Sequence, residues 1–210
     1  MKRFIVVAGN IGAGKSTLVR MLSERLDWFP YYEPVTQNPY LADFYGDMHR
    51  WSFHLQIYFL SNRFRYQKLI QESSESVIQD RSIYEDAEIF ARNLYDIGKM
   101  DERDYKNYVA LFHVMMAYLR APDLMIYLKA SVDTLTNQIA KRGREFEANI
   151  PRAYLEQLNV LYEDWINRYS IGKVLVIPSD DLDFVHRPKD FEYVAQLVKD
   201  ALPQMELFEK

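Results

Sequence analysis

Cysteine is absent from the 210 residues, so neither disulfide bonds nor thiol chemistry can contribute to the fold or the function. This composition suits a reducing cytoplasm, where we expect the protein to reside. No apolar run approaches the length of a membrane span, and the chain leads directly into a predicted strand without room for a signal peptide. We therefore expect no membrane partner.

The chain also lacks an excess of positive charge. Its formal net charge is −4, which argues against a nucleic-acid partner and against a nucleic-acid kinase with a basic groove. Internal repeats and low-complexity linkers are missing as well, and the length fits a single domain over residues 1–210. Apolar residues, in contrast, make up 49% of the chain, which is ample for a core.

The most informative motif occupies residues 9–17 and fits the pattern G-x-x-x-x-G-K-[ST]. An apolar, β-branched run at 4–8 precedes it, and leucines at helical spacing follow it, so strand, loop and helix are in register. A glycine-rich turn without a ligand would not need this context. The motif consists of Gly9, Asn10, Ile11, Gly12, Ala13, Gly14, Lys15, Ser16 and Thr17.

The residue types in this loop are suited to binding a phosphate chain. The glycines let backbone N–H groups point at a phosphate chain, and the helix N-terminus adds partial positive charge. Lys15 is expected to reach the β- and γ-phosphates of ATP, and the hydroxyl of Ser16 to hold Mg²⁺. The loop therefore predicts binding of a nucleoside triphosphate but does not identify the phosphoryl acceptor.

Predicted strands and helices alternate along the whole chain. This alternation indicates an α/β protein, doubly wound, with five parallel strands flanked by helices. Strands are expected at 4–8, 28–35, 77–80, 123–128 and 174–177, and helices behind the glycine-rich loop and at 39–45, 50–71, 83–98, 101–120, 132–140, from 151 onward and at 188–202.

Two predicted strands end in carboxylates. Parallel strands place their carboxyl ends at the edge that carries the chemistry, so Glu33 is a candidate general base, although an exposed carboxylate explains it equally well. Asp80 is a candidate second Mg²⁺ contact, and Arg81 beside it could clamp the transferring phosphoryl group. Alternatively, Asp80 or Ser82 caps the following helix, and both interpretations are compatible.

Three further polar groups are candidates with ordinary alternatives. Gln56 and Arg63 share one helix face, where they could bind a planar ligand or lie at the surface. Asp86 falls in a first helical turn, where the helix dipole alone would favour it. The basic segment at about 141–151 is interpreted as a short lid over phosphates, with a solvated basic turn as the alternative.

Taken together and in this order, the motifs resemble the deoxyribonucleoside kinase family, which has the P-loop kinase fold and phosphorylates the 5′-hydroxyl of deoxynucleosides. The resemblance extends over nearly the whole chain. The carrying segments are residues 9–17, Glu33-Pro34-Val35, Trp51-Ser52-Phe53-His54-Leu55-Gln56, Asp80-Arg81-Ser82, Ile89-Phe90-Ala91-Arg92-Asn93-Leu94-Tyr95 and Arg142-Gly143-Arg144.

The resemblance implies a role for each matching residue. Glu33 corresponds to the general base, and Arg81 to the arginine that meets the 5′-oxygen. Tyr45 and Glu147 correspond to the pair that holds the sugar 3′-hydroxyl. The family pattern further implies Mg²⁺ with ATP and a homodimer formed through the helices at 50–71 and 101–120. The base would be bound by Gln56 at its edge, Phe90 by stacking and the pair Arg63 and Asp86 behind it, with Arg142 and Arg144 as lid arginines.

The acceptor base is less firmly indicated. We favour deoxyadenosine, because Asp80-Arg81-Ser82 and Asn38-Pro39-Tyr40-Leu41 most resemble the bacterial deoxyadenosine kinases. Deoxyguanosine and deoxycytidine are the alternatives, because the pair Arg63 and Asp86 can serve each of these bases. Phe59, one turn after Gln56, would add bulk near the base. A thymidylate-type monophosphate kinase is a rival, but such enzymes tend to place an arginine just before the Glu-Pro pair, where this chain has Tyr31-Tyr32. A nucleotide-dependent switch would not need Glu33, Gln56, Arg63 and Asp86 together.

Overall fold

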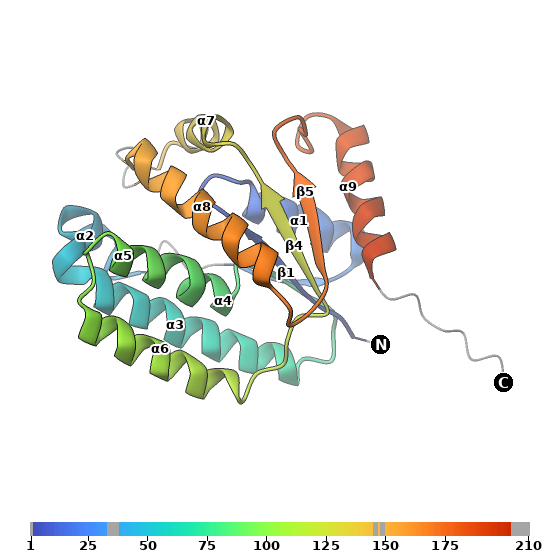
Figure 1. Cartoon of the computed structure of the whole chain (residues 1–210). Coiled ribbons are helices and arrows are strands. Elements are labelled where there is room, and N and C mark those ends of the chain that lie inside the picture. The colour runs from blue at the N-terminus through green and yellow to red at the C-terminus, as the bar shows by residue number, and fades with distance from the viewer. Residues whose placement is uncertain (1, 33–37, 145–146, 148–149, 203–210) are drawn as a thin grey trace.

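The computed structural model describes residues 2–32, 38–144, 147 and 150–202. Its five strands form one parallel sheet in the order β2-β3-β1-β4-β5, which confirms the predicted fold class (Figure 1). The strands are β1 (Phe4–Gly9), β2 (Phe29–Tyr31), β3 (Val77–Asp80), β4 (Leu124–Lys129) and β5 (Val174–Pro178).

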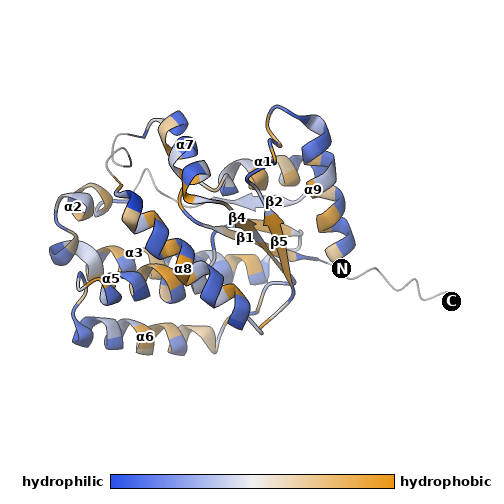
Figure 2. Ribbon diagram, turned by 45° about the horizontal axis from the view of Figure 1, so that its top comes forward, coloured by the Kyte–Doolittle hydropathy of each residue, from blue (hydrophilic) through white to orange (hydrophobic). Residues whose placement is uncertain are grey.

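Helices cover both faces of the sheet (Figure 1). On one side lie α1 (Lys15–Leu26) and α9 (Pro188–Ala201), with α7 (Val132–Arg142) packed into the same core. On the other side lie α3 (Met48–Glu72), α6 (Glu102–Met116) and α8 (Arg152–Arg168), together with the short α2 (Leu41–Gly46). The strands therefore run through the apolar centre of the molecule, with hydrophilic helix faces outside (Figure 2).

The apolar run of β1 explains this layering. Alternate side chains of a strand point to opposite faces of the sheet. Ile5 and Val7 accordingly join the core beneath α1 and α9, whereas Ala8 joins the core beneath α3 and α8. All six residues of β1 are buried, as expected for the central strand of a sheet covered on both faces.

Strand β2 is shorter than the sequence suggests. The prediction covers residues 28–35, and among the described part of this range, 28–32, only Phe29–Tyr31 pair with Val77–Gln79 of β3 at the edge of the sheet. Pro30 offers no N–H to the ladder, which is tolerated on an edge strand. The expected strand end at Glu33-Pro34 lies outside the described residues.

The helix predicted at 83–98 is not continuous. It consists of α4 (Ile83–Glu85), a π-helical turn η1 (Asp86–Ala91) and α5 (Arg92–Asp96). A π turn holds one residue more than a regular turn, and such turns are frequent at functional sites. Local propensity favours a regular helix here, so we attribute the extra residue to tertiary contacts: Asp86 pairs with Arg63, and Ile89 and Ala91 are buried.

The register of β1 and β3 brings the two main motifs together. Val7 lies opposite Asp80, so the phosphate-binding loop after β1 and the Asp80-Arg81-Ser82 segment after β3 leave the sheet side by side. The N–H of Arg81 donates to the carbonyl of Val7 at 3.0 Å, which extends the ladder by one bond. The carboxyl edge of the sheet therefore carries the site, as open α/β sheets require.

Candidate active site

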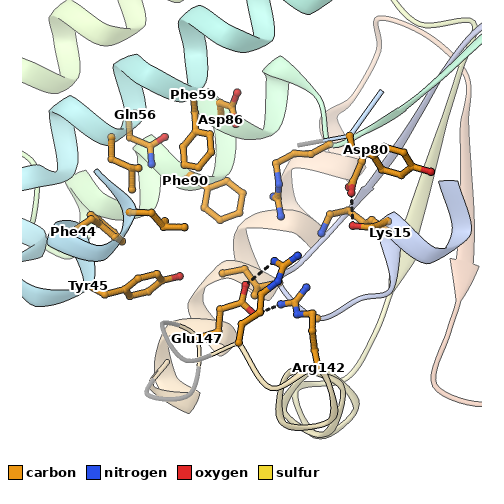
Figure 3. A pocket seen from close by; sticks show the side chains of 18 of the residues that line it. Lys15, Phe44, Tyr45, Gln56, Phe59, Asp80, Asp86, Phe90, Arg142 and Glu147 are labelled. Atoms are coloured by element: carbon orange, nitrogen blue, oxygen red, sulfur yellow. Dashed lines mark hydrogen bonds and ion pairs between the residues drawn. The ribbon is translucent and has the colours of Figure 1, made fainter. Parts of the chain in front are cut away.

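A cavity of about 240 Å³ opens above the carboxyl edge of the sheet (Figure 3). Its two ends differ in chemistry. One end presents Lys15, Ser16, Asp80 and Arg81, and the other is lined by aromatic rings with a few polar groups. The side chains of that second end come from α2, α3 and η1 and include Phe44, Tyr45, Leu55, Gln56, Phe59, Asp86 and Phe90.

The glycine-rich loop has the backbone that its sequence predicts. Gly9, Gly12 and Gly14 all have positive φ angles, of 149°, 86° and 89°. A Cβ atom on Gly12 would lie 2.7 Å from the carbonyl oxygen of Leu135, so the loop has no room for a side chain there.

Not every residue of the loop faces the cavity. The amide of Asn10 donates to the carbonyl of Leu155 in α8 at 3.0 Å, and Ala13 joins the core. The loop therefore offers its backbone, and Lys15 is held against it because its Nζ donates to the Asn10 carbonyl at 2.9 Å. The lining residues of the loop are Ile11, Gly12, Lys15 and Ser16, so Gly9, Gly14 and Thr17 support the loop without lining the cavity.

Two oxygen donors meet at the phosphate end of the cavity. The hydroxyl of Ser16 donates to Asp80 Oδ2 at 2.5 Å, which joins the first turn of α1 to the end of β3. Hydroxyl and carboxylate oxygens are the hard ligands that Mg²⁺ prefers, and it usually completes its shell with water and substrate phosphates. No group of three or more His, Asp or Glu side chains in the described part of the chain could form a dedicated metal cage. Ser16 and Asp80 thus fit an ion that arrives with a nucleotide.

Arg81 has an unusual backbone conformation. Its φ is 67°, a left-handed value that costs a residue with a Cβ atom about 1–2 kcal/mol. Its guanidinium lies over the ring of Phe90 at 4.4 Å from the ring centroid. The backbone strain thus accompanies a side chain directed between the two ends of the cavity.

Ser82 caps the helical segment, as one of the two interpretations predicts. Its hydroxyl accepts from the N–H of Glu85 at 3.2 Å, while Glu85 Oε2 accepts from the N–H of Ser82 at 2.7 Å. This reciprocal arrangement is a capping box. Because Ser82 provides the cap, Asp80 remains available to the Ser16 hydroxyl. The role of Asp80 as a Mg²⁺ contact stays a prediction that is compatible with this cap.

A buried ion pair lies behind the aromatic end. Arg63 Nε donates to Asp86 Oδ2 at 2.9 Å, and both side chains are at most 3% exposed. Arg63 Nη1 also donates to the carbonyl of Asp80 at 3.2 Å. Asp86 lines the cavity, whereas Arg63 lies behind it, so Arg63 would act on a ligand through Asp86.

The buried amide of Gln56 excludes the surface interpretation. Gln56 is 3% exposed, and its Oε1 atom has no hydrogen-bond partner among the described residues. An orphaned buried carbonyl costs about 1–3 kcal/mol, which a ligand hydrogen bond can recover. Gln56, Phe59 and Phe90 all line the cavity (Figure 3).

The basic segment at the end of α7 is held by ion pairs to one carboxylate. Glu147 is buried and forms ion pairs with Arg142 and with Arg144, the latter at 3.2 Å (Figure 3). All three residues line the cavity opposite the glycine-rich loop. The candidate base Glu33 lies outside the described residues, so its position relative to these groups stays a prediction.

Two residues at or next to the cavity were not evident as such in the sequence. Tyr154 and Tyr162 fall on the apolar stripe of α8, where they read as core, yet Tyr154 lines the cavity and the Tyr162 hydroxyl accepts a hydrogen bond from Arg81 Nη1 at 2.9 Å. Burial raises the pKa of Tyr154 to about 12 and that of Tyr162 well above its usual value. Both phenols therefore stay protonated, but no sequence pattern separates them from ordinary core tyrosines.

This combination of features defines a class. P-loop phosphotransferases that use a nucleoside triphosphate have this combination: a parallel sheet with a phosphate-binding loop, a neighbouring Asp-Arg pair and a partly aromatic acceptor cavity. The sequence model of the deoxynucleoside kinase family matches residues 5–203. The chain therefore belongs to the deoxynucleoside kinase family and is an ATP-dependent phosphotransferase.

Known relatives agree with this assignment over nearly their whole length. The chain is 43% identical over 200 residues to the deoxyadenosine/deoxycytidine kinase of Bacillus subtilis, covering 94% of this chain and 92% of that protein. It is 38% identical over 210 residues to a deoxyguanosine kinase of Lactobacillus acidophilus, covering 96% and 91%.

Solved structures show the same fold. Deoxyadenosine kinase from M. mycoides, with the products dCMP and a flexible dCDP bound, superimposes with a TM-score of 0.84 at 32% identity, covering 95% of this chain and 100% of that one. The same kinase with bound dATP gives a TM-score of 0.82 over 94% and 99% of the two chains. Among the described helices, none is both long and apolar enough to span a membrane.

The buried pair predicts a large loss of stability when one partner is removed. Replacing Arg63 by Met leaves Asp86 buried without the guanidinium, which should lower the free energy of unfolding by about 3–5 kcal/mol. The measurement is urea unfolding of the free protein. Arg92→Met is the matched control, because Arg92 pairs with Asp96 at the surface and should contribute only about 0–1 kcal/mol. Equal losses in the two variants would contradict the importance of the buried pair.

Proposed function

We propose that the protein transfers the γ-phosphoryl group of ATP to the 5′-hydroxyl of a deoxyribonucleoside, with deoxyadenosine as the preferred acceptor. The observation that carries this proposal is the buried amide of Gln56, whose Oε1 has no hydrogen-bond partner among the described residues, in a cavity that Asp86 and aromatic rings also line. A planar base can hydrogen-bond to both groups while its faces contact rings. Deoxyguanosine and deoxycytidine are the alternatives, since similar proteins are named for each of the three substrates.

At the donor end, the loop amides and Lys15 would bind the phosphates of ATP. Mg²⁺, held by Ser16 and Asp80, would neutralise charge on the β- and γ-phosphates. Arg81 would stabilise the charge that develops on the transferring group, because it lines the cavity together with Lys15 and Asp80 and its guanidinium lies over the Phe90 ring.

At the acceptor end, Phe90 would stack on the base, and Gln56 and Asp86 would bind its edge. Tyr45 and Glu147 would hold the 3′-hydroxyl of the sugar, which requires that Glu147 loosen its ion pairs with the lid arginines. Arg142 and Arg144 would then be released toward the phosphates. We therefore propose that residues 141–151 form a lid within a single domain and that sugar binding frees its charges.

The first experiment is a panel of acceptors assayed with Mg²⁺ and ATP. It comprises deoxyadenosine, deoxyguanosine, deoxycytidine, thymidine and the four corresponding monophosphates. We expect the highest kcat/KM for deoxyadenosine and no turnover of monophosphates, because nothing in the proposed acceptor roles requires an anionic acceptor. The folded variant Lys15→Met provides the background rate. Activity on thymidine monophosphate alone would contradict the proposal.

Glu33 is proposed as the general base for the 5′-hydroxyl. A sugar hydroxyl is a poor nucleophile, and a positioned base accelerates such a step by about 10²–10⁴-fold. Glu33→Gln should therefore lose most of kcat while its affinity for an ATP analogue, measured by calorimetry, stays unchanged. A near-normal kcat in this variant would remove Glu33 from the mechanism.

We further propose a homodimer through α3 and α6, two helices that pack side by side (Figure 1). Three apolar side chains, Leu111, Val114 and Tyr118, are exposed at helical spacing along α6 and the turn after it, and Leu69 of α3 is exposed as well. Such a row is expected where a second copy binds.

Sedimentation of the 25.0 kDa chain tests the dimer. Val114→Glu would place a charge in the proposed interface and should yield a monomer. Val160→Glu is the control, because Val160 is 69% exposed, similar to Val114 at 62%, but lies on α8. A monomeric parent protein, or dissociation by the control alone, would exclude this interface.

For the cellular location of the protein we propose the cytoplasm, which the absence of cysteine supports.

A further inference from the structure

A buried network of hydrogen bonds lies below the cavity, outside the set of groups that would touch a substrate. Its centre is Glu85, whose side chain is completely buried. Glu85 Oε2 accepts from the N–H and the hydroxyl of Ser82, at 2.7 and 3.0 Å. Glu85 Oε1 accepts from the N–H of Gly9 at 3.2 Å and from the hydroxyl of Tyr162 at 2.8 Å. One carboxylate thus binds three separate segments of the chain.

Capping accounts for only half of these contacts. A capping box needs the bond from the Ser82 N–H to the Glu85 carboxylate and the return bond from the Glu85 N–H to the Ser82 hydroxyl. The bonds of Oε1 to Gly9 and Tyr162 have no part in capping. They connect the start of the phosphate-binding loop with α8, and a solvent-exposed cap residue would make neither.

Tyr162 extends the network to the catalytic arginine. Its hydroxyl accepts from Arg81 Nη1 at 2.9 Å and lies 2.8 Å from both the Gly9 carbonyl and Glu85 Oε1. A phenol has one proton to donate, so this proton goes to one of these two oxygens while the guanidinium donates to the phenol oxygen. Arg81 Nη1 is also 3.5 Å from Glu85 Oε1, a buried ion pair.

The backbone conformation of Arg81 indicates that the contacts around this residue hold it in place. A left-handed φ of 67° is unfavourable for a residue with a side chain and persists only where the surroundings enforce it. The contacts that hold Arg81 include the Val7 carbonyl on its N–H and Arg63 Nη1 on its carbonyl oxygen, at 3.0 and 3.4 Å. They also include Tyr162 and Glu85 on its guanidinium. Without the side-chain contacts, the guanidinium could leave its position.

We propose that Glu85 and Tyr162 are positioning residues for phosphoryl transfer, which together fix the Arg81 guanidinium relative to the first glycine of the phosphate-binding loop. The N–H of Gly9 donates to Glu85 Oε1, and the Gly9 carbonyl oxygen lies 2.8 Å from the Tyr162 hydroxyl. The donor phosphates and the arginine that neutralises the transferring group are therefore aligned by a common anchor. Neither Glu85 nor Tyr162 lines the cavity, so each acts through Arg81 or the loop.

Tyr162→Phe is the direct test because it removes one oxygen and keeps the ring stacked on Tyr127. Loss of a hydrogen bond to a charged group should lower kcat by roughly 10- to 100-fold. Because Tyr162 does not touch a substrate, KM for ATP and for the deoxynucleoside should change by less than about threefold. Tyr127→Phe is the matched control: that ring stacks on Tyr162 at 5.7 Å, is also buried, and bonds through its hydroxyl to Glu163 rather than to Arg81. Its kcat should equal that of the parent.

A double-mutant cycle separates positioning from packing. If Tyr162 acts through Arg81, then adding Tyr162→Phe to Arg81→Ala should change the residual kcat by less than about twofold, because the two effects share one interaction. Equal losses with and without Arg81, or a rise in KM with normal kcat, would overturn the proposal. Glu85→Gln should lower kcat at least as much as Tyr162→Phe. If thermal unfolding shows that Glu85→Gln is not folded, the double-mutant cycle of Tyr162 and Arg81 still tests the positioning role.

The readout of this test rests on the proposed function, but the two can fail separately. A parent protein without turnover on any deoxynucleoside would refute the proposed function. An active parent whose Tyr162→Phe variant retains full kcat would refute only the positioning role.

Discussion

The alignment of β1 with β3 is the constraint on which the rest of the site depends. Two parallel strands whose carboxyl ends coincide deliver the phosphate-binding loop and the Asp80-Arg81-Ser82 segment to one point. The hydrogen bond between Ser16 and Asp80 then follows from the register of these two strands. A shift of one residue in this register would turn Asp80 to the opposite face of the sheet and separate the two oxygen donors.

Charge is distributed unequally across the cavity. At the aromatic end, Arg63 lies behind Asp86, so a ligand there would meet a dipolar pair rather than a net charge. The phosphate end holds Lys15 and Arg81, with Arg142 and Arg144 bound to Glu147 beside it. The proposed function would place the neutral base of one substrate and the phosphates of the other at opposite ends of one cavity.

The sequence allowed much of this arrangement to be predicted, and the physical reasons are specific. Strands and their order along the chain follow from apolar runs such as Phe4–Ala8, and the loop at 9–17 has a fixed pattern whose context agreed with it. Roles for Gln56, Arg63 and Asp86 were predicted through family resemblance. Spacing alone left Gln56 and Arg63 as possible surface groups, and the helix dipole alone could explain Asp86. The structure brings all three to the same end of the cavity.

Other features depend on tertiary contacts that no local pattern encodes. The roles of Tyr154 and Tyr162 depend on where α8 lies over the sheet, and the short β2 depends on how much of β3 is available at the edge. The second half of the Glu85 contacts arises because Gly9 and Tyr162 meet it from distant parts of the chain. Periodicity predicts which side of a helix is apolar, but not which buried hydroxyl will find a guanidinium.

The π turn at Asp86–Ala91 has a consequence for how this part of the chain can vary. Because it contains one residue more than a regular turn, losing any one of its residues would restore regular helical pairing. Everything on one side of the deletion would then rotate by about 100° about the helix axis relative to the other side. Asp86 and Phe90 would no longer both border the cavity. In this segment the number of residues is therefore constrained more tightly than their identity, and insertions or deletions should be rarer than substitutions.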